Sequence, residues 1–348
     1  MGGEDKLVLR IARALPSVVG VQSPSVRTRT GLTLGIGDDA AILVPAKDAE
    51  WIVSTDAFLE GVHFLGNRHP ADSVGYKALA RATSDLAAMG ARPRLYLLTL
   101  ALPARRTGRW LDDFLRGMAR AGRELGMLLA GGDTSQFPSF ALAITVLGEM
   151  PSGKAVKRSG ARPGDILYVS GRLGRAQLGL ELFRRLPRRE MRGPLARQGL
   201  LWRLLQPHLY PKVRMRLGLW LAERGIVSAM MDLSDGLSTD LARLCAASGV
   251  AARIWADRIP QVQLPAAKIR GVNSDNLDPL AMALHGGDDY ELLFTVPPRR
   301  VKDLRGAPGF SELSAIGQIE RGGRVVLVGN EGHTEPLRLG GWDSFRRK

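Results

Sequence analysis

The chain gathers its scarce acidic residues in short stretches that are rich in glycine, serine and threonine. Lysine and arginine number 49 against 34 aspartates and glutamates, so this grouping of acids is conspicuous. The stretches are GIGDDA (35–40), STD (54–56), TSDLAAMG (83–90), GGDTS (131–135), MDLSDG (231–236) and HGGDDYE (285–291). Such compositions are typical of tight backbone bends, and we therefore expect these carboxylates to be held on turns.

Aspartates held in this way are suited to binding Mg²⁺. This ion prefers oxygen ligands and keeps several waters together with substrate phosphates. Glycine beside the acids would let the backbone and a metal approach a phosphate closely; the glycines concerned are Gly35, Gly37, Gly131, Gly132, Gly286 and Gly287. Because the stretches lie far apart in the sequence, they would have to converge in the fold to form one site.

Purely structural interpretations compete with the metal interpretation at each position. Ser234 or Asp235 could cap the helix expected to follow them. Asp133 could stabilise a turn, and Ser54 and Thr55 could satisfy backbone groups at the end of a strand. Six such coincidences in one acid-poor chain favour metal ligands over the separate structural explanations.

Two nucleotide-binding motifs are nearly present, and neither predicts a phosphate loop. GEMPSGKA (148–155) has Walker A spacing, but Ala155 replaces the hydroxyl that would hold magnesium, and more loop follows. GIGDDA fits the G-x-G-x-x-A pattern. However, the strand-like AILVP follows it, so no helix N-terminus is expected there to receive a pyrophosphate.

Strands and helices alternate along the first half of the chain. Apolar periodicity and helix-ending residues predict helices at about 4–15, 70–91 and 107–126, and strands at 40–45, 51–59, 94–103 and 141–150. Asp85 lies within the second of these helices and, judged alone, would be interpreted as a solvated residue. The stretch 151–165 breaks the alternation with proline, glycine and lysine, and we place a domain boundary inside it.

The second half repeats the alternation. We expect a strand at 166–171, three helices, a strand at 228–232, a helix at 236–247, strands at 252–256 and 291–297, and a terminal hairpin formed by 315–319 and 324–329. The pattern favours two α/β or α+β domains, at 1–150 and 151–348.

Composition narrows the functional classes. The chain has 348 residues, is 45% hydrophobic and has no apolar run long enough to span a membrane. A single cysteine, Cys245, permits neither an intrachain disulfide nor a cysteine-based metal site, and we expect a cytoplasmic protein. The net charge of +15 suits phosphorylated substrates or nucleic acid. Dispersed basic residues and the lack of a recognition motif argue against nucleic acid.

Seven segments, in order, resemble the thiamine-monophosphate kinase family: GIGDDAAIL, STDAFLEGVHF, YKALARATSDLAAMGARP, AGGDTS, KRSGARPGDILYVSG, MDLSDGLSTDL and GGDDYELLFTVP. The family's superfamily includes aminoimidazole ribonucleotide synthetase and selenophosphate synthetase. The resemblance runs from about residue 5 to the C-terminus. It implies an N-terminal domain that binds ATP and magnesium and whose strands pair across a homodimer to close a barrel. It also implies a C-terminal α/β domain closing the nucleotide and substrate cleft.

The implied reaction is the last step of thiamine diphosphate synthesis, in which ATP phosphorylates thiamine monophosphate on a cluster of several Mg²⁺ ions. The alternative is another ATP-dependent synthetase of the superfamily. Selenophosphate synthetase would be expected to carry a reactive cysteine near the N-terminus, and this chain has none. The acceptor is already a phosphate oxyanion, since the second pKa of a phosphate monoester is about 6. No general base is therefore needed, and charge neutralisation with in-line positioning is the main requirement.

Matched positions carry the family's roles onto this chain. The resemblance implies magnesium ligands at Asp39, Ser54, Thr55, Asp56, Asp85, Asp133, Asp232 and Asp235, of which Asp39, Asp56, Asp85 and Asp133 would be catalytic. It implies ATP contacts at Gly132, Asp133, Arg158 and Ser234. It implies thiamine monophosphate contacts at His63, Asp288 and Trp342. The family usually has glutamate where this chain has Asp288, so a second possibility is that Asp288 or Asp289 only pins the turn.

Overall fold

The computed structural model describes residues 3–23, 25–26, 30–36, 40–186, 199–265, 277–329 and 331–345. Its contacts divide the chain into two compact units. The first unit comprises Met1–Leu86 and Ala91–Ala155, and the second comprises Ala87–Gly90 and Val156–Lys348.

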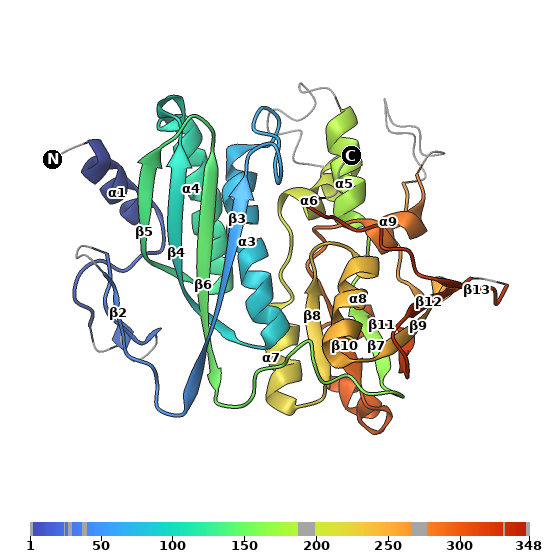
Figure 1. The fold of residues 1–348 in the computed structure, drawn as a ribbon. Helices are drawn as coiled ribbons and strands as arrows, with labels where there is room; N and C mark the ends of the chain where they lie inside the picture. The colour runs from blue at the N-terminus through green and yellow to red at the C-terminus, as the bar shows by residue number, and fades with distance from the viewer. Residues whose placement is uncertain are drawn as a thin grey trace. The chain divides into compact units, whose positions relative to one another are not determined.

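A four-stranded sheet forms the centre of the first unit (Figure 1). Its strands lie in the order β3 (Ala49–Leu59), β6 (Ala141–Pro151), β4 (Arg92–Leu102) and β5 (Leu128–Gln136). β6 pairs antiparallel with both β3 and β4, whereas β4 and β5 are parallel. The connection between the parallel strands is α4 (Arg109–Leu125), preceded by the short η1 (Ala104–Arg106), as expected for a crossover.

Helices cover one face of this sheet. α3 (Ala71–Met89) and α4 lie against it (Figure 1), while α1 (Gly3–Ala14) and the segment that holds the short strands β1 (Leu32–Leu34) and β2 (Ile42–Leu43) line a cavity together with β4 and β5. Successive β6 residues alternate between buried and half-buried, as side chains on opposite faces of a strand do. On the other face Val53 is 59% and Leu97 37% exposed. That face is therefore only partly covered, and among the described residues the sheet is not closed into a barrel.

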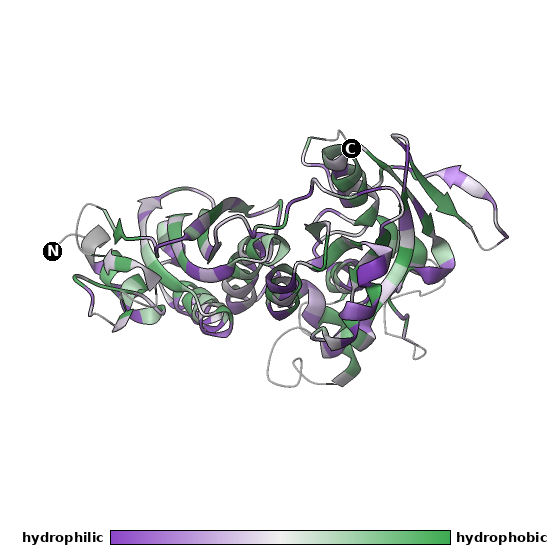
Figure 2. Cartoon of the chain, turned by 90° about the horizontal axis from the view of Figure 1, so that it is seen from below, coloured by the Kyte–Doolittle hydropathy of each residue, from purple (hydrophilic) through white to green (hydrophobic). Residues whose placement is uncertain are grey.

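Amphipathic helices supply much of the core. In α4 the buried residues Leu111, Phe114, Leu115 and Met118 follow helical spacing, which predicts one apolar stripe facing the sheet. Hydrophilic and hydrophobic residues accordingly both occur along the helices in Figure 2. No helix among the described residues combines the length and apolar character that crossing a membrane requires.

The second unit contains a seven-stranded sheet in the order β13-β12-β9-β11-β7-β10-β8. These strands are β7 (Ile166–Ser170), β8 (Ala229–Leu233), β9 (Ala251–Trp255), β10 (Glu291–Val296), β11 (Leu313–Glu320), β12 (Val325–Val328) and β13 (Thr334–Pro336). Its helices are α5 (Arg175–Arg185), α6 (Gly199–Leu209), α7 (Met215–Arg224), α8 (Leu237–Ser248) and α9 (Pro279–His285), with short η4 (Ala256–Arg258), η6 (Pro298–Gly306) and η7 (Phe310–Glu312).

Most predicted elements are confirmed, and the terminal hairpin is wrong. β11 and β12 contain its two predicted strands, but β9 lies between them: β11 pairs antiparallel with β9, and β12 pairs parallel with it. The strand that β12 does form a hairpin with is β13. Apolar alternation identified both strands but carries no information about which neighbour each strand takes. β5 was not predicted, and only Ile42–Leu43 of the strand expected at 40–45 is extended.

Candidate active site

Three of the predicted metal residues meet where β3 and α3 face each other. Ser54 and Asp56 point to the same side of β3 because they are two residues apart. The hydroxyl of Ser54 donates a hydrogen bond to Oδ2 of Asp85, on α3, at 2.5 Å. Nε of Arg81, one helical turn before Asp85, donates to Oδ2 of Asp56 at 3.1 Å. Two carboxylates and a hydroxyl therefore share this helix-covered face of the sheet.

Thr55 and Asp133 lie on the opposite face. Thr55 pairs with Thr145, and the Thr145 hydroxyl donates to that of Thr55 at 3.1 Å. Thr145 pairs in turn with Leu97 of β4, and Asp133 pairs with Thr99, two residues further along the same strand. Even spacing along a strand keeps side chains on one face. The structure thus divides the predicted metal residues of the first unit between the two faces of the sheet.

The expectation that the acids sit on tight turns is wrong for several of them. Asp56, Asp133 and Asp232 lie within strands, and Asp85 lies within a helix. Asp39 and Gly37 lie outside the described residues. The composition of these stretches suggested turns because glycine and serine are common in turns. In this fold, however, glycine is needed at some of these positions for another reason.

Gly132 shows that cause. A Cβ atom at Gly132 would come within 2.0 Å of the Leu98 carbonyl oxygen, and the φ angle of Gly132 is 155°. A Cβ at Gly35 would likewise come within 2.1 Å of the Val18 carbonyl oxygen. These glycines are required by close approach of the protein's own backbone segments, whether or not a phosphate also lies near them.

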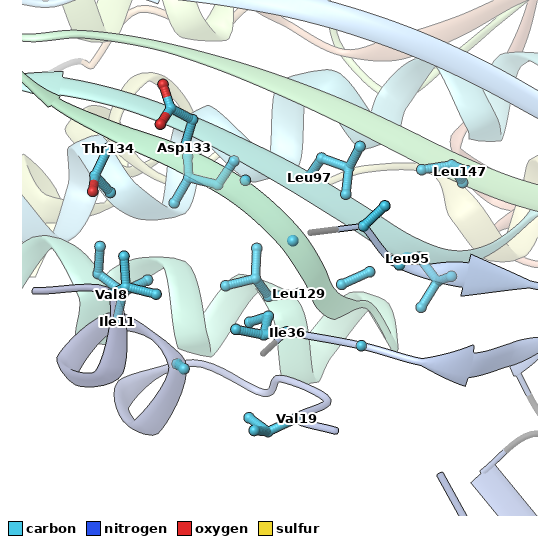
Figure 3. Close-up of a pocket in the computed structure, with 18 of the residues that line it drawn as sticks. Val8, Ile11, Val19, Ile36, Leu95, Leu97, Leu129, Asp133, Thr134 and Leu147 are labelled. Atoms are coloured by element: carbon cyan, nitrogen blue, oxygen red, sulfur yellow. The ribbon is translucent and has the colours of Figure 1, made fainter. Parts of the chain in front are cut away.

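A cavity of about 690 Å³ opens beside Asp133 in the first unit. Its walls are mainly apolar side chains from α1, β4 and β5, and Asp133 lies with Thr134 at one end (Figure 3). Asp133 is the one charged side chain among the described residues that line it. A triphosphate needs hydrogen-bond donors and cations, so these walls suit apolar groups better than phosphates.

His63 follows β3 and is held by that strand. Its Nδ1 accepts a hydrogen bond from the backbone N–H of Leu59 at 3.0 Å. Its ring stacks on Phe58, with the ring centroids 5.6 Å apart. Because Nδ1 is an acceptor, the proton of the neutral imidazole is on Nε2. The ring is thus oriented as a hydrogen-bond donor through Nε2.

In the second unit, Asp240 organises the loop that carries two predicted residues. Its Oδ2 accepts hydrogen bonds from the backbone N–H groups of Ser234, Asp235 and Gly236 at 3.1, 3.0 and 3.1 Å. Gly236 is the N-cap of α8 and no side chain caps the helix there, so the capping interpretation of Ser234 or Asp235 is wrong. Asp240 is buried, and this burial raises its pKa to about 6. An acidic residue in the first turn after a glycine was the sequence signal for this role.

Backbone hydrogen bonds bring four predicted residues of the second unit together. The N–H of Asp288 donates to the carbonyl of Ser234 at 2.9 Å, and the N–H of Trp342 donates to the carbonyl of Asp235 at 2.8 Å. The carboxylate of Asp235 accepts from Arg243 at 2.5 Å. Asp232 precedes this loop and is buried in β8.

Arg158 stands apart from this group in the chain. It lies in the segment before β7, its side chain is exposed, and its carbonyl accepts from the Ser248 hydroxyl at 2.8 Å. Its predicted contact with ATP therefore rests on the family resemblance alone.

Asp288 and Asp289 have different surroundings. Asp288 adopts a left-handed backbone with φ of 69°; its Oδ1 accepts from the Tyr290 hydroxyl at 2.7 Å, and its Oδ2 is 4.0 Å from Nδ1 of buried His208. Asp289 accepts from the backbone N–H groups of Gly174 and Ala176, at 2.5 and 3.0 Å, and so binds the N-terminus of α5. Burial raises the pKa of Asp289 to about 7. Pinning of the turn is thus the role of Asp289.

The oxygen donors on β3 and α3 fit Mg²⁺ in type. Ser54, Asp56 and Asp85 offer one hydroxyl and two carboxylates, which are hard ligands. Among the described residues, however, no three histidine, cysteine, aspartate or glutamate side chains lie close enough together to hold an ion. The donor set fits in chemistry and would need further oxygen ligands, such as water, to be complete.

Comparison with known proteins identifies relatives over nearly the whole chain. Residues 37–150 match the family described as AIR synthase related protein, N-terminal domain, and residues 162–330 match the corresponding C-terminal domain. The predicted two-domain α/β fold is therefore confirmed, while strand pairing across a dimer stays a prediction.

Two similar bacterial proteins are both thiamine-monophosphate kinases. The thiamine-monophosphate kinase of Salmonella typhimurium (strain LT2) is 40% identical over 270 residues, covering 78% of each chain. That of Escherichia coli (strain K12) is 36% identical over 320 residues, covering 91% of this chain and 94% of that protein. A solved structure of AaThiL complexed with AMPPCP and TMP is 30% identical, has a TM-score of 0.72, and covers 87% of this chain and 89% of its own.

Proposed function

We propose that this chain, which belongs to the thiamine-monophosphate kinase family, transfers the γ-phosphoryl group of ATP to thiamine monophosphate, giving ADP and thiamine diphosphate. The observation that carries the proposal is the relative that is 36% identical over 91% of this chain and 94% of its own length. The complex of the similar AaThiL with AMPPCP and TMP supports it. These relatives favour the kinase over another ATP-dependent synthetase of the superfamily.

The reaction requires positioning and charge neutralisation more than proton transfer. A phosphate monoester is already an oxyanion near neutral pH, because its second pKa is about 6. Its oxygen can therefore attack the γ-phosphorus without a general base. ADP is the leaving group, and the attacking and leaving oxygens must lie in line. Bound Mg²⁺ would supply charge neutralisation.

The residues of β3 and α3 are suited to holding that metal. In our proposal Asp56 and Asp85 present carboxylate oxygens on one face of the sheet, and Ser54 orients the Asp85 carboxylate through its hydroxyl. Asp39, Thr55, Asp133, Asp232 and Asp235 complete the proposed ligand set, which would serve several ions, because Thr55 and Asp133 lie on the other face of the sheet from Asp56. The support for it is the oxygen chemistry of these residues and the 2.5 Å bond between Ser54 and Asp85.

Substrate contacts are proposed for residues of both units. Gly132, Asp133, Arg158 and Ser234 are the proposed ATP contacts. His63, Asp288 and Trp342 are the proposed contacts of thiamine monophosphate. The backbone bond from Leu59 to Nδ1 and the stacking on Phe58 support the role of His63, because they hold its ring in one orientation.

We further propose that the strands of the four-stranded sheet pair with those of a second copy of the chain to close a barrel, with the partly covered face of the sheet inside. Val53 and Leu97 expose apolar surface there, and burying such surface is favourable by roughly 25 cal/mol per Å². Sedimentation equilibrium should report a dimer, and Val53→Glu should shift it towards the monomer. A monomer at all concentrations of the parent protein would contradict this.

Three further assignments stay predictions. They are nucleotide binding by residues 1–150, closure of the cleft by residues 151–348, and a cytoplasmic location.

Product analysis tests the function directly. The protein is incubated with ATP labelled in the γ-phosphate, Mg²⁺ and thiamine monophosphate, with free thiamine in a parallel reaction. Label should appear in thiamine diphosphate only when the monophosphate is present. Label released solely as inorganic phosphate, or transferred equally to free thiamine, would overturn the proposal.

The dependence of the rate on free Mg²⁺ tests the number of metal ions. A rate that continues to rise with free Mg²⁺ after all ATP is saturated would support more than one metal ion.

A further inference from the structure

Arg81 occupies a carboxylate that the proposed function assigns to magnesium. Its Nε donates to Oδ2 of Asp56 at 3.1 Å, and the two side chains are only 16% and 28% exposed. The next acidic ligand candidate, Asp85, lies four residues later on the same helix. A guanidinium group therefore sits on the acidic face that is meant to receive a divalent cation.

The guanidinium of Arg81 is held in place from a second side. It lies over the ring of Phe58, with the central carbon 5.5 Å from the ring centroid, a cation–π arrangement. Phe58 is itself buried, and its ring also stacks with that of His63. The contact with the face of the Phe58 ring helps to hold the guanidinium beside Asp56.

We propose that Arg81 is the built-in counter-cation of this metal site. Resting on the proposed function, the inference is that Arg81 neutralises Asp56 while no metal is bound, and competes with Mg²⁺ for the same carboxylate. Two cations next to one carboxylate repel each other, most strongly where solvent is partly excluded. Arg81 thereby sets the Mg²⁺ concentration at which the site fills.

Removing the charge of Arg81 should have two opposite effects. Without metal, Asp56 loses its ion-pair partner on a face of the sheet that also carries the Asp85 carboxylate, so the metal-free protein should unfold at a lower temperature. With metal, the competitor is absent, so Mg²⁺ should bind more tightly. A charge-assisted hydrogen bond is worth about 1.5–3 kcal/mol, which corresponds to a half-saturating Mg²⁺ concentration lower by about tenfold or more.

The experiment follows the melting temperature of the full-length protein, without nucleotide, as MgCl₂ is added at constant ionic strength. The variants are Arg81→Met, Arg81→Lys, Asp56→Asn and the control Arg94→Met. Arg94 pairs with Glu149 at 2.9 Å on the same sheet, and these side chains are 24% and 16% exposed. This control therefore removes a similarly buried ion pair that involves no proposed metal ligand.

Arg81→Met should start from a lower melting temperature and reach half of its Mg²⁺-induced rise at about one tenth of the parent concentration. Arg81→Lys should lie between the two, and Arg94→Met should keep the parent half-saturation. If Arg81→Met binds Mg²⁺ no more tightly while Asp56→Asn weakens binding, the inference is overturned and the proposed metal site stands. If Asp56→Asn matches the parent, or if no variant responds to Mg²⁺, Asp56 is not a ligand and the inference falls with that assignment.

Discussion

The hydroxyl of Ser54 donates to Oδ2 of Asp85 across 2.5 Å, which ties the edge strand β3 to helix α3. The two residues are 31 positions apart in the chain, and neither gives a signal for this contact in its local sequence. Hydrogen bonds to ionised carboxylates are stronger than neutral ones. The bond therefore fixes the orientation of the Asp85 carboxylate relative to β3.

We expect Asp85→Asn to lower the phosphorylation rate by about 100-fold or more, the scale seen when one preorganised electrostatic contact is removed from an active site. The fold should persist, because the amide oxygen can still accept from Ser54 and no cavity is created. Product formation and circular dichroism measure the two effects. Asp113→Asn, in an exposed ion pair with Arg116 on α4, is the control. A native spectrum with a rate within about threefold of the parent would remove Asp85 from the site.

The adjacent residues Asp288 and Asp289 should separate substrate binding from stability. Asp288→Ala should raise the KM for thiamine monophosphate by about ten- to a hundredfold, the loss expected for a charge-assisted hydrogen bond. The KM for ATP should barely change. Asp288→Glu should be tolerated, because glutamate is the usual residue in the family.

Asp289→Asn is the matched variant for that experiment. Both oxygens of Asp289 accept from the N-terminus of α5, and an amide can offer only one acceptor. Its melting temperature should fall, with a loss of about 1–3 kcal/mol of unfolding free energy, while the KM for thiamine monophosphate stays near that of the parent. Asp288 would be reassigned to a structural role if its alanine variant lost stability without a change in KM.

The sequence predicted the positions of the helices and strands better than it predicted which strands pair with each other. Apolar periodicity found α3, β3 and β10 near their observed bounds, because amphipathic patterning is local. It failed for β12, whose partners β9 and β13 depend on pairings that no local pattern encodes. It also missed β5, since the glycines that let this strand approach β4 resemble a turn in composition.

The residues of the candidate site were likewise only partly predictable from the sequence. The family resemblance nominated Ser54, Asp85 and Asp288 at matched positions, and their roles stay predictions. The role of Asp240 is local and was missed, whereas the role of Arg81 depends on a tertiary contact. Asp240 binds three backbone N–H groups of the preceding loop, and Arg81 reaches Asp56 only because α3 packs on β3.

Asp289 should also give the protein a specific pH dependence. Burial raises its pKa to about 7 in the folded state, whereas an unfolded aspartate has a pKa of about 3.9. Between these values the folded state binds more protons, so the contribution of Asp289 to stability is fully present below about pH 4 and is lost as the pH rises through about 7. The stability difference between the parent and Asp289→Asn should therefore narrow from about pH 4 to about pH 8.

Urea unfolding of both proteins at several pH values measures this difference. Acids that do not interact with Asp289, such as Asp240, titrate in both proteins and cancel in the comparison, whereas Glu291 and Asp288 interact with Asp289 and contribute to the measured difference. A difference that stays constant or widens with rising pH would show that Asp289 does not titrate in this range.

Gly132 provides a test of why glycine stands beside Asp133. A Cβ atom there would lie 2.0 Å from the Leu98 carbonyl oxygen, and Gly132 has a φ of 155°, so Gly132→Ala must push β5 away from β4. We expect a loss of at least about 2 kcal/mol of unfolding free energy, from backbone strain together with the clash. Gly126→Ala is the control: Gly126 also has a positive φ, 70°, but open space around it, and its substitution should cost about 1 kcal/mol. Urea unfolding of both variants measures the two losses. Equal losses would mean that the approach of β5 to β4 does not require glycine, and the conformation of Gly132 would then be explained by its proposed contact with ATP.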